Sequence, residues 1–478
     1  MTSIKSSLKE IDAEILYQTN PLAKFVENQR IVEVPELTLE SGITIRNFPV
    51  AYKTWGRLNE ARNNVLLICH AMTGSADVSD WWGPLLGTNL AFDPSRFLVV
   101  CLNCLGSPYG SFSPLSVSAV TGRRYGPEFP LCTVRDDVRA HKIVLDSLGV
   151  NSIACVVGGS MGGMLALEWA VMYSAGYVRS LVALATSARN SAWCISWSEA
   201  QRQSIYCDPK YLDGYYSLDD PPNVGLSAAR MSALLTYRSR DSFETRFSRN
   251  SPTTVEQLKS SLPDKGNKPD FQEHNISIHN SGHQGFRFEN RERVGSISSD
   301  GSVESIGLSS SSTSLTSLTP AVKRPKALQT HFSAQSYLRY QGAKFTKRFD
   351  ANCYISITRK LDTHDLVRDR PQYNGIHDIL NTIAQPVLVI GIKSDGLFTY
   401  SEQEFLSEHI PNSQLEQINS PDGHDAFLLE FRLINELIIK FLEKNIQDIM
   451  DTAGYPWEES VQYEAKESVF GASEVTNW

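Results

Sequence analysis

Residues 156–164, VVGGSMGGM, decide the fold of this chain. The β-forming run 153–157 leads into a Gly-x-Ser-x-Gly turn, and the helix-forming run 165–170 follows directly. A strand, a tight turn and a helix in this order are typical of a nucleophile elbow, which exposes the serine hydroxyl. The N-terminus of the following helix offers free N–H groups to an oxyanion. The stretch therefore predicts that Ser160 is a nucleophile, whereas the turn pattern without its flanks could be a simple Gly/Ser turn.

The segments on either side of this stretch alternate between strand and helix patterns. Strands are expected at 32–39, 48–54, 64–69, 97–102, 153–157, 178–185, 386–392 and 414–418. Thr133 with Asp136 forms a capping-box pattern, and Gly149 ends the amphipathic helix that follows. A long amphipathic helix, 426–444, is expected to close the fold. This alternation predicts a mostly parallel sheet with helices on both faces.

Composition divides the chain into parts. We expect an N-terminal extension (1–30), a first part of the α/β core (31–186), a helical lid (187–370), a second part of the core (371–450) and a C-terminal tail (451–478). Within the lid, residues 250–328 form a low-complexity insertion rich in Ser, Thr and Gly. Such a segment buries too little apolar area to offset the entropy of ordering. We expect a disordered surface spacer, with phosphorylation of its serines as the alternative role.

Charge and cysteine usage exclude several classes of protein. The net charge of −8 argues against nucleic acid as the main partner, because phosphate binding needs a basic surface. The first residues lack the apolar core of a signal peptide, and no apolar run approaches the length of a membrane span. The eight cysteines are scattered, several within apolar runs, and Cys101-x-x-Cys104 has no second pair at metal-ligand spacing. We therefore expect a cytoplasmic protein with reduced thiols, no metal, and no nucleic-acid or membrane partner.

A serine nucleophile needs a base to take its proton and a carboxylate to orient that base. In the fold predicted here the acid and the histidine follow the serine in that order, each on a loop after a strand. Asp395 directly follows an apolar strand, and His424 follows the last short strand. Asp422 and Asp425 flank the histidine too closely to serve as its acid, and His70 precedes the serine. The sequence therefore predicts a triad with Asp395 and His424, although a turn aspartate and a structural loop histidine are the alternative interpretations.

Two backbone N–H groups are candidates for an oxyanion hole. Met161 follows the nucleophile at the start of the helix. Met72 lies on the loop after the third core strand, where the second donor is expected in this fold. His70, on the same loop, is expected to have a structural role.

Five motifs together resemble one family. They are CHAMTGSAD (69–77), GGSMGGM (158–164), LTYRSR (235–240), SDGLF (394–398) and GHDAFL (423–428). They closely resemble the homoserine O-acetyltransferases, a family with the α/β-hydrolase fold. The resemblance runs from about residue 20 to 445 and fails only in the low-complexity insertion, which fungal members carry. Relatives that use succinyl-CoA, or that accept serine or deacetylcephalosporin C, have similar motifs.

The resemblance implies a ping-pong acetyl transfer in methionine biosynthesis. Ser160 would attack the thioester of acetyl-CoA, with His424 as base and Asp395 orienting the imidazole. The acetyl group would then pass from Ser160 to the hydroxyl of L-homoserine. Acetyl-CoA is thus a co-substrate, and no permanently bound cofactor is expected. A serine esterase or hydrolase on the same triad, and a binding module without catalysis, remain alternatives.

The resemblance also implies how the amino-acid substrate is held. Arg230, in the helical lid, would bind the substrate carboxylate, and Asp425 would bind its ammonium group. A zwitterion needs one fixed cation and one fixed anion, and a guanidinium fork matches a carboxylate. Without the resemblance, Arg230 could be a solvated helix residue and Asp425 the N-cap of the closing helix. The lid would shield the elbow from water and build a homodimer.

Overall fold

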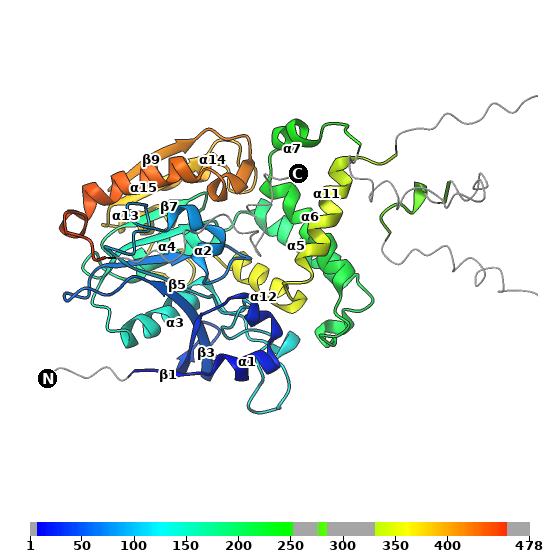
Figure 1. The fold of residues 1–478 in the computed structure, drawn as a ribbon, viewed down its shortest axis with the longest axis horizontal. Helices are drawn as coiled ribbons and strands as arrows, with labels where there is room; N and C mark the ends of the chain where they lie inside the picture. The colour runs from blue at the N-terminus through cyan, green and yellow to red at the C-terminus, as the bar shows by residue number, and fades with distance from the viewer. Residues whose placement is uncertain (1–6, 252–274, 277, 284–329, 457–478) are drawn as a thin grey trace, which may run out of the picture. The chain divides into compact units, whose positions relative to one another are not determined.

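The computed structural model describes residues 7–251, 275–276, 278–283 and 330–456 (Figure 1). Most of the expected insertion 250–328 and most of the expected tail lie outside these residues. Residues 1–246 with 340–478 form one compact unit, and residues 247–339 form a second. All the predicted site residues belong to the first unit.

The described residues contain one sheet of nine strands in the order β1-β2-β3-β5-β4-β6-β7-β8-β9. The strands are β1 (Lys9–Glu10), β2 (Arg30–Thr38), β3 (Thr44–Trp55), β4 (Val65–Cys69), β5 (Leu98–Leu102), β6 (Ile153–Gly159), β7 (Leu181–Leu184), β8 (Val387–Ile392) and β9 (Ser413–Ile418). Pairing is antiparallel from β1 to β5 and parallel from β5 to β9. The predicted strands are all present, with ends that differ by up to four residues, and the mostly parallel sheet is confirmed.

The inner strands are buried on both faces, which explains their continuous apolar sequences. Every residue of β4, β5, β6, β7 and β8 is buried. Along β4, Val65 and Leu67 pack into one apolar cluster, whereas Leu66 and Ile68 pack into the other. The first cluster includes α3 and α4, and the second includes α15. Helices therefore cover the sheet on both sides, as the alternating pattern predicts.

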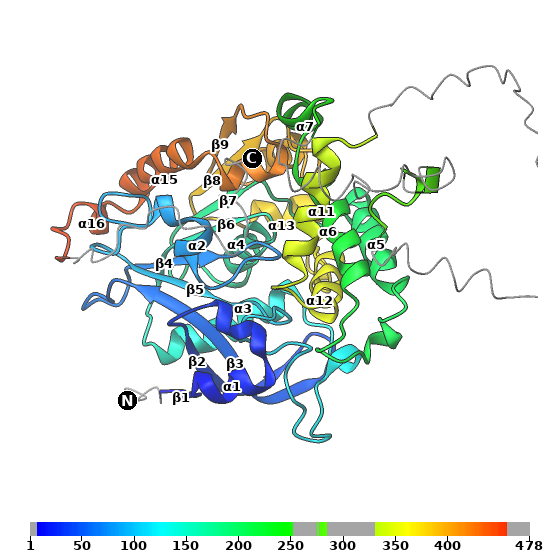
Figure 2. The ribbon, with the colours of Figure 1, turned by 45° about the vertical axis from the view of Figure 1, so that its right-hand side comes forward.

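The helices fall into a core set and a lid set. Those of the core are α1 (Ala13–Thr19), α2 (Val78–Trp81), α3 (Val134–Ser147), α4 (Met161–Met172), α13 (Ile376–Asn381), α14 (Tyr400–His409), α15 (Phe431–Asn445) and α16 (Gln447–Met450). Those of the lid, which precede α13 in the segment between β7 and β8, are α5 (Ala192–Tyr206), α6 (Asn223–Tyr237), α7 (Arg240–Phe247), α11 (Ser333–Phe345) and α12 (Ala351–Asp362). Helices α5, α6 and α12 lie beside one another at one end of the sheet (Figure 2).

Of the two helix starts predicted from the sequence, the structure confirms one and contradicts the other. The capping box at Thr133 and Asp136 is confirmed: each side chain accepts the backbone N–H of the other residue. The closing helix does not begin at residue 426, however. Residues Gly423–Leu428 form a 3₁₀ helix, and Leu429 and Glu430 leave the helical conformation before α15 begins at Phe431. The apolar periodicity continues across this break, so the pattern could not reveal it.

Candidate active site

Ser160 lies at the sharp turn between β6 and α4. Its backbone has φ 58° and ψ −125°, a conformation that L-residues rarely adopt. The turn needs glycine on both sides, because a Cβ at Gly158 would lie 2.0 Å from the Gly162 carbonyl oxygen, and one at Gly162 would lie 2.0 Å from that of Cys69. Ser160 is the N-cap of α4, but its side chain makes no capping hydrogen bond. The hydroxyl is therefore not used by the helix.

Asp395 and His424 meet at the carboxyl ends of the paired strands β8 and β9. Asp395 Oδ2 lies 2.7 Å from His424 Nδ1. The other carboxylate oxygen, Oδ1, accepts the backbone N–H groups of Leu397 (2.8 Å) and Phe398 (3.0 Å). Burial alone would lower the pKa of His424, but the neighbouring Asp395 and Asp425 carboxylates outweigh it and raise that pKa. The arrangement orients the imidazole and stabilises its protonated form.

The turn that carries Ser160 packs against the segment that carries His424. A Cβ at Gly159 would lie 2.6 Å from the ring of Phe427. That ring is 5.1 Å from the His424 ring, measured between centroids. Phe398, three residues after Asp395, lies 5.3 Å from His424 on the same measure. The three predicted residues thus belong to segments that pack together, although Ser160 is more than 200 residues from the other two in the chain.

The two candidate oxyanion donors lie on neighbouring segments. Met161 is the first residue of α4 and is fully buried. Met72 lies in a tight turn that the Gly74 N–H closes onto the Ala71 carbonyl at 2.9 Å. A Cβ at Gly162 would also come within 3.2 Å of the His70 carbonyl oxygen. The start of α4 therefore contacts the chain just before Met72.

A fully buried ion pair joins α12 to α3. Lys360 of α12 and Asp137 of α3 are both 0% exposed, and the Lys360 ammonium donates to the Asp137 carboxylate. Both groups also bind Leu105: Lys360 Nζ donates to its carbonyl (2.7 Å), and Asp137 Oδ1 accepts its N–H (2.8 Å). The pair therefore fixes both backbone groups of one residue and fastens a lid helix to the core. Sequence reasoning missed it, because neither position stands out in its local pattern.

His70 connects that anchor to the loop of Met72. Its Nε2 accepts the backbone N–H of Cys104, the residue before Leu105, at 2.9 Å. Its Nδ1 then donates to the Ala71 carbonyl at 2.8 Å. Burial and the nearby Lys360 lower the pKa of His70 to about 4, against the effect of the Ala71 bond. The ring is neutral and held by backbone at both nitrogens, as expected of a structural histidine.

Arg230 lies on α6 with its guanidinium over two rings. It is 8% exposed and lies 4.9 Å from the Phe345 ring and 5.6 Å from the Tyr237 ring. The guanidinium has no ion-pair partner among the residues that the structure describes. Buried cations are usually paired, so Arg230 is available to an anionic ligand.

Asp425 faces a second buried cation. Arg238 Nε lies 3.0 Å from Asp425 Oδ2, although the N–H is not directed at that oxygen, and Arg238 Nη1 donates to Asp422 at 2.6 Å. Burial raises the pKa of Asp425, opposed by Arg238, by His424 and by Arg230. Asp425 is thus a partly buried carboxylate next to the histidine, with one oxygen already beside a cation.

Tyr237 joins the predicted residues together, and sequence reasoning did not single it out. Its ring lies beside Arg230 and 6.1 Å from the His424 ring, and its hydroxyl lies 3.9 Å from the sulfur of Met72. The signal was present, since Tyr237 stands in the LTYRSR motif, but a tyrosine at a helix end has no distinctive spacing.

Comparison with known proteins identifies the family. The family model described as "alpha/beta hydrolase fold" matches residues 64–272. A homoserine O-acetyltransferase of Saccharomyces pastorianus is 63% identical over 487 residues, which cover 100% of this chain and 99% of that protein. The chain belongs to the homoserine O-acetyltransferase family.

Solved structures agree on the fold. A homoserine O-acetyltransferase from Bacillus anthracis has a TM-score of 0.67 and 21% identity, covering 88% of this chain and 98% of that one. The esterase E22 has a TM-score of 0.65 and 23% identity, covering 87% of this chain and 100% of that one. The predicted α/β-hydrolase fold of this homoserine O-acetyltransferase family member is therefore confirmed.

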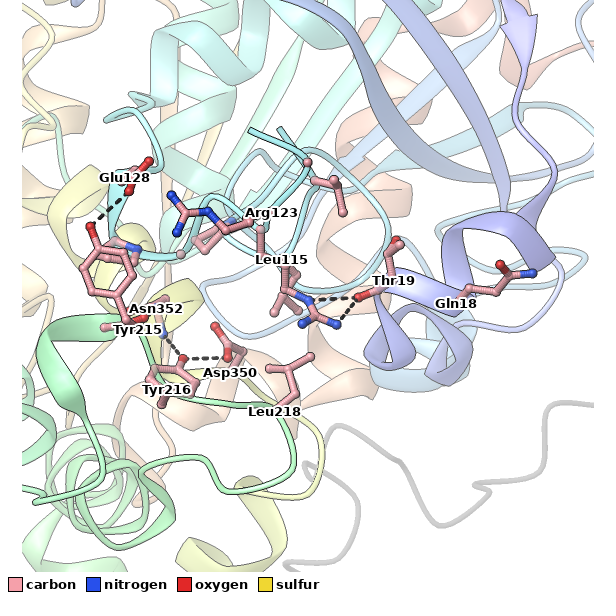
Figure 3. A pocket seen from close by; sticks show the side chains of 17 residues that line it. Gln18, Thr19, Leu115, Arg123, Glu128, Tyr215, Tyr216, Leu218, Asp350 and Asn352 are labelled. Atoms are coloured by element: carbon pink, nitrogen blue, oxygen red, sulfur yellow. Dashed lines mark hydrogen bonds between the residues drawn. The ribbon is translucent and has the colours of Figure 1, made fainter. Parts of the chain in front are cut away.

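A pocket of about 430 Å³ elsewhere in this family member contains none of the predicted site residues (Figure 3). Its buried polar groups are bonded to one another: the Tyr216 hydroxyl donates to Asp350 at 2.7 Å and accepts the Asn352 N–H at 2.9 Å. At its rim, the exposed Tyr215 donates to Glu128. The Tyr216 hydroxyl in the wall of this pocket thus already has a hydrogen-bond acceptor and a donor within the protein.

The described residues contain neither a cluster of metal-binding side chains nor a membrane-spanning helix. No three or more His, Cys, Asp or Glu side chains there are grouped so that they could hold a metal ion. Within the same residues, no helix has the length and apolar character to cross a membrane. The cysteines are all free thiols, and all but Cys207 are buried.

Proposed function

We propose that this chain transfers the acetyl group of acetyl-CoA to the hydroxyl of L-homoserine, giving O-acetyl-L-homoserine and CoA in methionine biosynthesis. The Saccharomyces pastorianus relative with this name is 63% identical to this chain over 99% of its own length. The observation that carries the mechanism is the 2.7 Å pair of Asp395 and His424, which packs through Phe427 against the turn of Ser160. No permanently bound cofactor is needed, and a cytoplasmic location suits both substrates.

In the first half-reaction Ser160 attacks the thioester carbonyl of acetyl-CoA. His424 accepts the hydroxyl proton, and Asp395 holds the imidazole and stabilises its positive charge. The backbone N–H groups of Met161 and Met72 bind the negative oxygen of the tetrahedral intermediate. The C–S bond then breaks, CoA leaves with the proton from His424, and the acetyl group remains on Ser160.

In the second half-reaction the homoserine hydroxyl attacks acetyl-Ser160. Arg230 binds the substrate carboxylate, because its guanidinium lies over two aromatic rings and has no ion-pair partner among the described residues. Asp425 binds the ammonium group with the carboxylate oxygen that Arg238 does not face. His424 takes the hydroxyl proton and returns it to Ser160 as the ester bond to the enzyme breaks.

We also infer a homodimer built through the lid. Large apolar side chains on α5 and α6 are exposed in the single chain: Trp193 is 55% exposed, Leu235 51% and Val224 48%. Burying such side chains against a second copy would remove apolar surface from water. Light scattering on the purified protein should give twice the mass of one chain.

The decisive assay separates transfer from hydrolysis. Purified protein with acetyl-CoA should release CoA at a rate that rises steeply with homoserine, and equal release without homoserine would support an esterase. Esterase E22 shares the fold, so hydrolysis is the second candidate. Ser160→Ala should abolish the acetyl-enzyme seen by mass spectrometry, and an adduct that persists would refute the nucleophile. Rates with succinyl-CoA and with serine measure donor and acceptor specificity.

A further inference from the structure

One hydroxyl bridges the two loops that carry the acid and the base. Ser394 Oγ donates to the Ser420 carbonyl at 2.6 Å and accepts the Gly423 N–H at 3.0 Å. Ser394 precedes Asp395, and Gly423 precedes His424. The Ser394 hydroxyl therefore acts both as donor and as acceptor. Its two hydrogen bonds join the residue before Asp395 to the loop of His424, beside the 2.7 Å acid–base pair.

The backbone cannot make this connection. Strands β8 and β9 are paired in register up to Ile392 and Ile418, and the Lys393 N–H bonds the Ile418 carbonyl at 3.2 Å. Beyond that point both chains leave the sheet, and the ladder of backbone hydrogen bonds ends. The Ser394 side chain adds two bonds just past the last ladder bond, between that bond and the Asp395–His424 pair.

The base loop is held from its other side by the end of α6. Gly423 has φ +67°, and a Cβ there would lie 2.6 Å from the Ser239 nitrogen. The Ser239 hydroxyl donates to the Pro421 carbonyl. The loop thus has a close contact toward the lid, and toward the acid loop it has the Ser394 hydroxyl beside the Asp395–His424 pair itself.

We propose that Ser394 is a positioning residue, which fixes the loop of His424 relative to the loop of Asp395. This inference rests on the proposed function, because it assumes that Asp395 and His424 act together. Displacement of a catalytic group by about 1 Å can cost about 100-fold in rate. Loss of both Ser394 bonds would leave Arg230 on α6 and the Arg238 contact of Asp425 in place, so the effect should fall mainly on kcat.

The test compares three variants. Ser394→Ala should lower kcat by about 10- to 100-fold with KM for homoserine within about threefold, because turnover depends on the orientation of the imidazole. Ser394→Thr keeps the hydroxyl and should restore kcat. Ser413→Ala is the matched control: at the other end of β9, the Ser413 hydroxyl donates to the Ser407 carbonyl at 2.8 Å. Its kcat should stay within about twofold of the parent.

The pH profile adds a readout that a purely structural role would not move. The charged and titratable groups around His424 are Asp395, Asp425, Tyr237 and, beyond Asp425, Arg238. A looser contact with Asp395 weakens the effect that raises the pKa of His424, so the acid limb of kcat/KM should move to lower pH in Ser394→Ala. In Ser413→Ala the limb should not move.

Several outcomes would overturn the proposal. They are a kcat near the parent's in folded Ser394→Ala, an unmoved acid limb, or equal losses in Ser394→Ala and Ser413→Ala. If the alanine variant does not fold, Ser394→Cys, with a weakly bonding thiol, should show the same direction of change. Ser160→Ala separates the two levels: an active Ser160→Ala refutes the proposed function, whereas an inactive Ser160→Ala beside a normal Ser394→Ala refutes only this inference.

Discussion

Replacing Lys360 with methionine tests the buried anchor that fastens α12 to the core. Lys360 and Asp137 are both 0% exposed, so removing the ammonium leaves a carboxylate in the interior without its cation. Breaking a buried pair in this way costs about 3–5 kcal/mol. A domain has only about 5–15 kcal/mol of stability, so Lys360→Met should lose a large fraction of it.

Urea denaturation followed by tryptophan fluorescence measures this loss. With a slope near 3 kcal/mol/M, the midpoint should fall by about 1–2 M at an unchanged slope. The double variant Lys360→Met/Asp137→Leu removes both charges and should regain about 2 kcal/mol or more, because it buries no unpaired ion. A single variant that loses less than about 1 kcal/mol, or a double variant as unstable as the single one, would refute the reasoning.

The stability of Lys360→Met should also depend on pH with a defined sign. Burial raises the pKa of Asp137, and Lys360 is the cation that opposes this rise. Without Lys360, folded Asp137 keeps a proton that the unfolded chain releases. The unfolding free energy of the variant should therefore fall as the pH rises from the ordinary aspartate range toward the raised pKa. A flat profile would show that Asp137 finds another partner.

Three other perturbations have defined outcomes. Gly159→Ala places a methyl group 2.6 Å from the buried Phe427 ring, so overpacking should cost about 1–3 kcal/mol in thermal unfolding and lower kcat. Arg230→Met should raise KM for homoserine by about 10- to 100-fold, equivalent to losing a charge-assisted bond of about 1.5–3 kcal/mol, while acetyl-enzyme still forms from acetyl-CoA in a mass-spectrometric assay. Deleting about residues 255–325 should leave kcat within about twofold, because surface insertions of this composition rarely carry core contacts, and a large loss in steady-state turnover would contradict this.

The sequence predicted those features that depend on local pattern. Strand, turn and helix signals located the turn of Ser160 and the strand ends before Asp395 and His424, because each signal lies within about ten residues. The structure brings Asp395 and His424 into hydrogen-bond contact, as predicted. The predicted start of α15 was wrong, because the spacing of apolar residues is the same on both sides of the two non-helical residues Leu429 and Glu430.

Features made by distant residues could not be predicted. Arg238 contacts Asp425, and Lys360 contacts Asp137. In each pair a residue of the lid lies against a core residue that is far from it in the sequence. A charged residue in a helix pattern is ordinarily assigned to a solvated face, so burial of Lys360 contradicts the usual rule. Only the three-dimensional arrangement shows which charges are paired in the interior.

The pairing of β7 with β8 has a consequence for biosynthesis. Leu181–Leu184 bonds Val387–Ile390, although about 200 residues separate the two strands in the chain. At a translation rate of about 5–20 residues per second, the interval between synthesis of β7 and synthesis of β8 is roughly 10–40 s. During that interval a nascent chain exposes an apolar, unpaired strand edge that invites aggregation. The length of the segment between β7 and β8 therefore sets how long this strand edge stays unpaired during synthesis.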